Sequence, residues 1–178
     1  EILIEGHEDY ALEAGGNYLR GYYPNAEESE IHMLLNCKRE SISAGTILLK
    51  DQEKPEHVIL VLTGVAELLS ANDKTHFKLT SGTLIGDLPL LFGLKNKGTF
   101  RALTYVETLK IPAILFKEFV NNHRLLGQIK KTQNTIEFLR QTWLFGESIS
   151  TPVQSQIAQK MKIRKYEKGA SITCEGLM

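Results

Sequence analysis

The stretch IGDLPLLFGLKNKGTF, residues 85–100, decides the fold. It has the spacing of a loop that wraps an anion: a glycine, an acid, an apolar half-turn and a basic tip. Gly86 lets backbone N–H groups approach an anion closely, and a short helix starting near Asp87 would direct its positive end toward that anion. Pro89 is tolerated because it falls in the first turn of that helix.

The bulk composition is that of an ordinary globular protein. The chain has 178 residues, of which 42% are hydrophobic and 24% charged, and 21 basic residues balance 21 acidic ones. A formal net charge of zero argues against a nucleic-acid-binding surface. No apolar stretch approaches the roughly 18 residues of a membrane helix, and no signal peptide is present.

Two cysteines, Cys37 and Cys174, lie far apart and in no metal-ligand pattern. Each is expected to be a small buried hydrophobe, which favours a reducing compartment. We therefore expect a cytoplasmic protein without a membrane segment. Because the chain starts at Glu1 and not at Met, we also expect it to be cut from something longer.

The middle of the chain has the pattern of a β-rich unit. Short apolar or alternating runs follow one another at close spacing, which favours a sandwich or barrel over a βαβ fold. Gly45, Gly64 and Gly82 fall at the joints, where a positive φ is cheapest for glycine. The predicted strand segments are RESISAGTILLKD (39–51), HVILVLTG (57–64), VAELLS (65–70), HFKLTSG (76–82), TFRALTYV (99–106) and ETLKIP (107–112).

Helical spacing flanks this unit on both sides. A helix is predicted from Ala26 to Cys37, with Asn25 as its N-cap and Glu28 in a capping-box position. After Pro112 we expect a short amphipathic helix carrying Ile114, Leu115, Phe116, Phe119 and Val120. A longer helix is predicted over 124–139, where one face can carry Leu125, Leu126, Ile129, Ile136 and Leu139, and a third helix over 152–161. Residues 1–24 have no clear period and stay unassigned.

The tail repeats the start of the β-rich unit. Setting Gly45 over Gly169 aligns RESISAGTILLKD with RKYEKGASITCE, an offset of 124 residues. A repeat of that length is a whole domain with its linker. We therefore predict three parts: an N-terminal extension over 1–24, a domain over 25–140, and the truncated start of a second domain over 141–178.

Four features together resemble the cyclic-nucleotide-binding domain family, which includes catabolite activator proteins and kinase regulatory subunits. They are HVILVLTGVAEL (57–68), LRQTWLF (139–145), YEKGASITCEG (166–176) and the stretch at 85–100, which matches the family's phosphate-binding cassette. The resemblance covers about 26–138 and begins again from 139 to 178. It implies a mainly β, α+β fold: a jelly-roll-like β-roll, or double-stranded β-helix, with N-terminal and C-terminal helices.

The cassette departs from the family pattern at two chemical positions. The family glutamate, which accepts the ribose hydroxyl, is Asp87, and the family arginine, which pairs with the cyclic phosphate, is Asn96. Losing that charged fork should weaken phosphate binding by roughly one to two decades, although Lys95 or Lys97 could restore the charge. The resemblance carries over these ligand-binding residues: Gly86, Asp87, Leu88, Asn96, Lys97, Gly98 and Thr99.

The predicted function is regulatory and not enzymatic, because no catalytic or metal-binding constellation is evident. The run His7-Glu8-Asp9 is interpreted as a solvated turn. One hypothesis is a sensor that binds a cyclic nucleotide, cAMP or cGMP, or a related anion without any required cofactor, and repacks its C-terminal helices. The alternative is a degenerate fold for protein–protein contact without nucleotide. The helix over 124–139 is either a homodimer seam or packs on its own β-roll or on the following domain. Leu88, Leu90, Leu91 and Phe92 are expected in the core whether or not the cassette binds a ligand.

Overall fold

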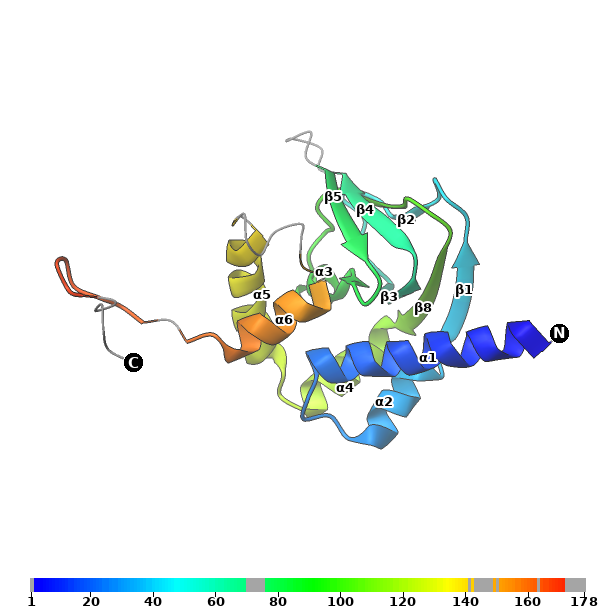
Figure 1. Cartoon of the computed structure of the whole chain (residues 1–178), viewed down its shortest axis with the longest axis horizontal. Helices are drawn as coiled ribbons and strands as arrows, with labels where there is room; N and C mark the ends of the chain where they lie inside the picture. The colour runs from blue at the N-terminus through cyan, green and yellow to red at the C-terminus, as the bar shows by residue number, and fades with distance from the viewer. Residues whose placement is uncertain are drawn as a thin grey trace.

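A β-roll with helices on both sides of it forms the described part of the chain (Figure 1). The computed structural model of the protein describes residues 2–69, 76–140, 142, 149, 151–162 and 164–171. The helices are α1 (Ile2–Tyr22), α2 (Glu28–Leu35), α3 (Asp87–Phe92), α4 (Ala113–Asn122), α5 (Leu126–Arg140) and α6 (Thr151–Lys160). The strands are β1 (Lys38–Ile42), β2 (Ile47–Leu49), β3 (His57–Thr63), β4 (Val65–Leu69), β5 (His76–Thr80), β6 (Leu84–Ile85), β7 (Thr99–Ala102) and β8 (Val106–Pro112).

The strands form two antiparallel four-stranded sheets with a nested order. One sheet runs β1-β8-β3-β6 and the other β2-β7-β4-β5. The outermost strands β1 and β8 pair, then β2 with β7, β3 with β6 and β4 with β5. This is the pairing of a long hairpin folded over on itself, so the predicted jelly-roll-like β-roll is confirmed.

Most of the predicted β segments are strands, but one boundary was wrong. The prediction joined residues 99–106 into one strand, whereas the structure ends β7 at Ala102 and turns before Val106. The hydroxyl of Thr104 accepts the N–H of Val65 at 3.0 Å, which holds this turn beside the first residue of β4. The short strand β6 was not predicted, because two residues carry no period of their own.

The prediction for the first helix region was also wrong at its start. Asn25 is not the N-cap; α2 begins at Glu28, after a turn in which Ala26 N donates to Tyr23 O at 3.0 Å. A capping interaction does occur, but two residues later than predicted, where Glu30 accepts the N–H of Glu27 at 3.0 Å. The tyrosine-containing turn holds residues 23–26 out of the helix.

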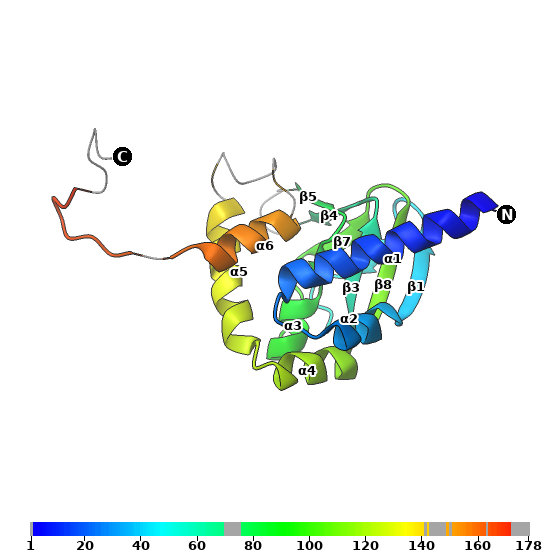
Figure 2. The ribbon, with the colours of Figure 1, turned by 60° about the horizontal axis from the view of Figure 1, so that its bottom comes forward.

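Residues 2–22, which the sequence left unassigned, form the long helix α1, so the turn predicted at residues 7–9 was wrong. Figure 2 shows α1 lying along the roll, and α1 contacts β3. Gly15 permits this close approach, since a Cβ there would lie 2.8 Å from Leu62 Cδ2. Glycine at this position interrupts the apolar periodicity of the helix, and its lack of a side chain allows the helix to pack closely on the roll.

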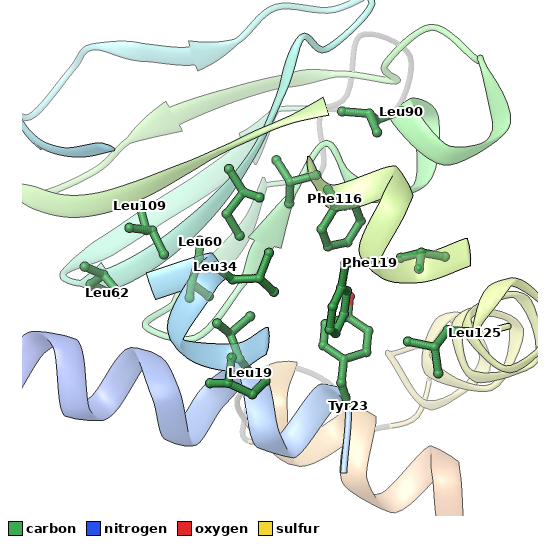
Figure 3. Packing of buried hydrophobic residues seen from close by; sticks show 14 of the residues in the cluster. Leu19, Tyr23, Leu34, Leu60, Leu62, Leu90, Leu109, Phe116, Phe119 and Leu125 are labelled. Carbon is green, nitrogen blue, oxygen red and sulfur yellow. The ribbon is translucent and has the colours of Figure 1, made fainter. Parts of the chain in front are cut away.

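The main core lies between one face of the roll and the helices. Figure 3 shows Leu60, Leu62 and Leu109 of the sheet facing Leu34 of α2 and Phe116 of α4. A second, smaller core fills the space inside the roll, formed by Leu49, Ile59, Val61, Ala66, Leu79 and Ile85. These two cores hold the roll and its covering helices in one arrangement.

Within α4 the predicted apolar face is confirmed for three of five residues. Phe116, Phe119 and Val120 are buried, and Leu115 is half-buried. Ile114 points away from the core and is 74% exposed. Ala113 and Leu115 on either side of it pack against the main core, so Ile114 is exposed because it lies on the opposite side of the helix from Phe116.

The helix α5 buries most of its predicted apolar face inside the chain. Leu125, Ile136 and Leu139 are buried, and Ile129 packs against the main core. Leu126 is 38% exposed and does not belong to that face. The packing partners of α5 include α6, through the cluster of Ile136, Leu139 and Ala158.

The described residues after α6 extend away from the roll (Figures 1 and 2). A turn at Lys168 and Gly169, closed by Ala170 N donating to Glu167 O at 3.0 Å, lies where the repeat predicted one. No strand forms in 161–162 or 164–171, and the rest of the predicted hairpin at 166–176 lies outside the described residues.

Candidate ligand-binding site

The loop that opened the sequence analysis has the predicted form. After β6 the chain turns at Gly86, runs through the short helix α3 and reaches β7 by way of residues 93–98. A Cβ on Gly86 would lie 3.2 Å from Pro55 Cβ and 3.3 Å from His57 O, so this position favours glycine. Pro89 is the third residue of α3, where a missing N–H breaks no helical hydrogen bond.

A cavity of about 370 Å³ lies between this loop, the interior of the roll and α5. That volume is within the range of small-molecule sites. Five predicted site residues line the cavity, namely Gly86, Asp87, Leu88, Asn96 and Lys97. The other lining residues are Tyr22, Leu68, Leu79, Thr83, Leu84, Pro89, Leu94, Lys95, Phe100, Gln133 and Ile136.

Gly98 and Thr99, the other two predicted site residues, do not line this cavity. Gly98 N donates to Asp51 Oδ1 at 2.7 Å, and Thr99 Oγ1 accepts the N–H of Asp51 at 3.2 Å. Both residues therefore bind the loop that follows β2. Their role as ligand contacts stays a prediction.

Asn96 joins the same two loops and is almost fully buried. Its side-chain amide nitrogen donates to Gly98 O at 2.8 Å and to Lys50 O at 3.2 Å. Its backbone N–H donates to Glu53 O at 2.8 Å. An amide has two N–H donors, so both donors of this side chain already have protein acceptors. Asn96 braces the loop, and its exposed fraction is only 4%.

The acidic group of the cavity is Asp87, which is half-buried at the start of α3. Its carboxylate lies near Tyr23, whose pKa burial raises well above its ordinary value, with the charge of Asp87 adding to the effect. Tyr22, the neighbouring residue at the end of α1, lines the cavity itself. The acid is therefore held against an aromatic wall from the N-terminal helix.

The basic groups of the cavity lie at its opening. Lys95 and Lys97 both line it, and both are exposed to solvent. An exposed ammonium is strongly hydrated and flexible. These lysines can attract an anion to the opening without holding it in a fixed geometry.

The helix α5 covers the cavity with Gln133 and Ile136. A smaller cavity of about 30 Å³ lies behind it, lined in part by Tyr22, Asp87, Gln133 and Ile136, the same residues that line the larger one. The helix α6 in turn contacts α5 and α1. A ligand in the cavity would therefore contact α5 directly, and α6 packs on α5.

Of the core residues predicted in α3, Phe92 is an exception. Leu90 is buried and Leu91 half-buried, but Phe92 is 41% exposed and Leu88 faces the cavity. The helix ends at Gly93 with φ 65°, which turns its last residue outward.

Sequence reasoning missed the cavity residues that come from the flanking helices. Tyr22 lies in the stretch that was left unassigned, and Gln133 is a polar residue on a helix predicted only for its apolar face. The two adjacent tyrosines before Pro24, Tyr22 and Tyr23, were the sequence feature that could have indicated a contribution to the cavity from this stretch.

The described side chains contain no group of three His, Cys, Asp or Glu residues that could hold a metal ion. Likewise, no helix built from described residues combines the length and apolar character of a membrane span.

Comparisons with known proteins agree with the fold. Residues 39–123 match the family model "Cyclic nucleotide-binding domain", which covers a little under half of the chain. The matched segment runs from β1 through α4. A search of curated protein sequences found no match to the chain.

Solved kinase regulatory subunits share the fold. The regulatory domain of Toxoplasma gondii PKA with cAMP has a TM-score of 0.59 at 16% identity, covering 83% of this chain and 57% of that one. The regulatory subunit of a cAMP-independent protein kinase A from Trypanosoma cruzi, bound to guanosine, has a TM-score of 0.62 at 14% identity, covering 84% and 52%. A Trypanosoma brucei counterpart has a TM-score of 0.56 at 18% identity, covering 70% and 47%. The chain thus spans about half the length of these structures.

Proposed function

We propose that this chain is a non-catalytic, ligand-sensing regulatory domain, which binds a cyclic nucleotide or a related nucleotide-sized molecule. The observation that carries the proposal is the 370 Å³ cavity enclosed by the predicted cassette loop and α5. A ligand in that position contacts the roll and the C-terminal helices at once. The domain needs no other cofactor for this role.

The polar and apolar parts of the cavity are suited to such a ligand. Asp87 is an acceptor for a hydroxyl group, as the resemblance to the family implies for this position. Leu68, Leu79 and Phe100 supply an apolar wall for a flat ring. The T. gondii relative was solved with cAMP and the T. cruzi relative with guanosine, so the fold accommodates ligands with and without a phosphate.

Sensing requires two arrangements that bind the ligand unequally. We infer that α5 and α6 supply them. Gln159 on α6 donates to the carbonyls of Gly21 and Tyr22 at 3.3 and 3.0 Å, which ties α6 to the end of α1 beside the cavity. A ligand that displaces Gln133 or Ile136 would shift this contact.

A second candidate function is a protein-interaction module that binds no nucleotide. Asn96 favours this second candidate. The resemblance places it at the family's phosphate-binding position, but its side chain is buried and donates to the carbonyls of Lys50 and Gly98. The predicted homodimer through 124–139 belongs to this candidate. Among the described side chains of α5, Leu126 and Phe138 are exposed apolar groups, at 38% and 60%, that are available for such a contact.

Isothermal titration calorimetry with cAMP, cGMP, adenosine and guanosine tests the proposal. We expect saturable binding of at least one ligand, lost in Asp87→Ala and retained in Glu118→Ala, a matched removal of an acid on the exposed side of α4. Binding that survives Asp87→Ala would place the ligand elsewhere. No binding at millimolar ligand would favour the interaction module.

Two parts of the sequence prediction stay predictions. One is that residues 141–178 begin a second, tandem domain of the same family. The other is a cytoplasmic location. A chain extended beyond Met178 that binds two ligands with independent sites would support the first.

A further inference from the structure

We propose that the small cavity between α1, α5 and α6 is a binding site for ordered water, which joins α6 to α5. This inference goes beyond the proposed function and does not require a ligand in the larger cavity. It rests on the hydroxyl groups of Thr132 and Ser155, which line the small cavity from the two helices.

The small cavity lies where three helices meet. The helix α6 contacts both α5 and α1, and Figure 2 shows it lying against α5 near the end of α1. The volume of the cavity is about 30 Å³, whereas a single water molecule needs roughly 10–15 Å³. The space is therefore suited to water and is far too small for a nucleotide.

Two hydroxyl groups point to this occupant. Thr132 on α5 is 9% exposed and Ser155 on α6 is 2% exposed. Within the described part of the chain, neither hydroxyl forms a hydrogen bond with another protein group. Neither oxygen is among the fully enclosed, unpartnered side-chain atoms either, so each stays open to the cavity. A buried hydroxyl without a hydrogen bond is unfavourable, and a water that bonds to both removes that cost.

The other polar groups around the cavity fit the same occupant. The amide nitrogen of Gln159 donates to two carbonyls at the end of α1, at 3.3 and 3.0 Å, which leaves its side-chain oxygen as an acceptor. The backbone groups of Thr132 and Ser155 lie inside helices, where helical hydrogen bonds use them. Tyr22 and Asp87 line the cavity as well, but they interact with other protein groups, so the water site does not require them.

The two hydroxyls and the Gln159 oxygen are three bonding groups, within the range of about two to four that a buried water uses. The apolar contact between α5 and α6 is small, since its buried part consists of Ile136, Leu139 and Ala158. A water bridge in the same interface should therefore carry a measurable part of the contact that holds α6.

A double-mutant cycle tests whether the two hydroxyls share a water. Thr132→Val and Ser155→Ala each remove one hydroxyl with little change of shape, and amide hydrogen exchange in α6 is measured in each, in the double variant and in the native chain. We expect exchange in α6 to become about fivefold faster in each single variant, because the remaining hydroxyl loses its bridge.

The double variant should exchange no faster than either single variant, since both ends of the bridge are then absent. Thr135→Val is the matched control, because the Thr135 hydroxyl donates to Lys131 O at 3.1 Å within α5 and does not line the cavity. It should leave exchange in α6 at the native rate. Effects of Thr132→Val and Ser155→Ala that multiply in the double variant, or single variants that exchange at the native rate, would overturn the proposal.

A high-resolution crystal structure of the native chain gives a direct readout. We expect ordered water at about 2.7–3.0 Å from the hydroxyl oxygens of both Thr132 and Ser155. The same water should be missing from the double variant. Hydroxyls that instead bond to carbonyls of their own helices, with no ordered water between α5 and α6, would contradict the inference and leave the proposed function intact.

Discussion

Asn96 shows how one side chain changes the use of a loop. An arginine presents a long, charged fork that reaches outward to a ligand, whereas the short neutral amide of asparagine reaches only nearby carbonyls. Here those carbonyls belong to Lys50 and Gly98, and the amide is buried between them. The loop still follows the path between α3 and β7, and the Asn96 amide binds protein carbonyls.

Gly64 is the glycine whose replacement should be most damaging. It joins β3 to β4 with φ 88°, and a Cβ there would lie 2.3 Å from Tyr105 O. We expect Gly64→Ala to lower the free energy of unfolding by at least about 3 kcal/mol, measured by urea denaturation.

Gly45→Ala is the matched control for that prediction. Its φ is 85°, but a Cβ there would meet nothing within 4 Å. It should therefore lose only the roughly 1 kcal/mol of left-handed strain. Equal losses in the two variants would show that backbone conformation, and not the collision, governs Gly64.

Glu40 should make the fold sensitive to acid. Hydrogen bonds from Lys110 and then Lys38 lower its pKa from 4.5 to about 2. A carboxylate with a lowered pKa stabilises the fold above the unfolded value and loses that contribution as pH falls from about 4.5 toward 2. Glu40→Gln should remove about 1 kcal/mol at neutral pH, after allowance for solvent screening, and flatten the fall in stability across this window.

Urea denaturation at a series of pH values between about 2 and 7 measures this effect. Glu118→Gln, on the exposed side of α4, should leave the acid dependence as it is in the native protein. A native-like slope in Glu40→Gln would show that other carboxylates govern the acid response.

The helix α1 forms although its sequence has a low intrinsic helix propensity. Its sequence contains Gly15, Gly16 and Gly21, which disfavour an isolated helix. Two of them make room instead: for Leu62 at Gly15, and for Gln156 at Gly21, where a Cβ would lie 2.9 Å from Gln156 Nε2. Tertiary packing therefore stabilises this helix.

The contact between α6 and α1 should depend on Gln159. Its amide donates to two carbonyls at the end of α1, and these carbonyls have no acceptor role inside the helix. Gln159→Ala should remove about 1 kcal/mol of this contact and speed amide hydrogen exchange in α6 and at the end of α1.

Exchange in β3 should stay unchanged, since the main packing partners of α6 are α5 and α1. Lys160→Ala, at the exposed neighbouring residue, is the control. If exchange in α6 stays at the native rate in Gln159→Ala, apolar packing in the cluster of Ile136, Leu139 and Ala158 is sufficient to hold the helix.

The molecule as a whole is held by the core between the roll and the helices. Phe116 of α4 is fully buried there, with its ring centroid 6.3 Å from that of Tyr23. Phe116→Ala should lower the free energy of unfolding by about 3–5 kcal/mol, measured by thermal or urea denaturation.

Ile114→Ala tests the same helix two residues earlier. Ile114 is 74% exposed, so this variant should stay within about 0.5 kcal/mol of the native protein. A large loss in Ile114→Ala would indicate that the apolar surface of α4 has a partner in solution.

The strand-rich unit could be predicted as a sandwich or barrel because its signals are local, and the resemblance to a family narrowed this to a β-roll. Turn glycines such as Gly45 and Gly64 punctuate the strands, and the stretch at 85–100 has a spacing that few other loops share. The starts of the helices were less certain, because Asn25 and Glu27 are both acceptable near an N-terminus. The turn at Tyr23 decided between them.

The amino-acid sequence by itself determined the positions of most strands and turns, the loop at 85–100 and five of the sixteen residues that line the cavity, since these depend on local periodicity and on residues close in the chain. Only the tertiary structure decided that α1 is a helix, that Tyr22 and Gln133 reach the cavity, and that Asn96, Gly98 and Thr99 bind another loop. Those outcomes depend on partners 40 or more residues away, such as Asp51 for Gly98. Contacts between distant segments leave no period in the sequence that could predict them.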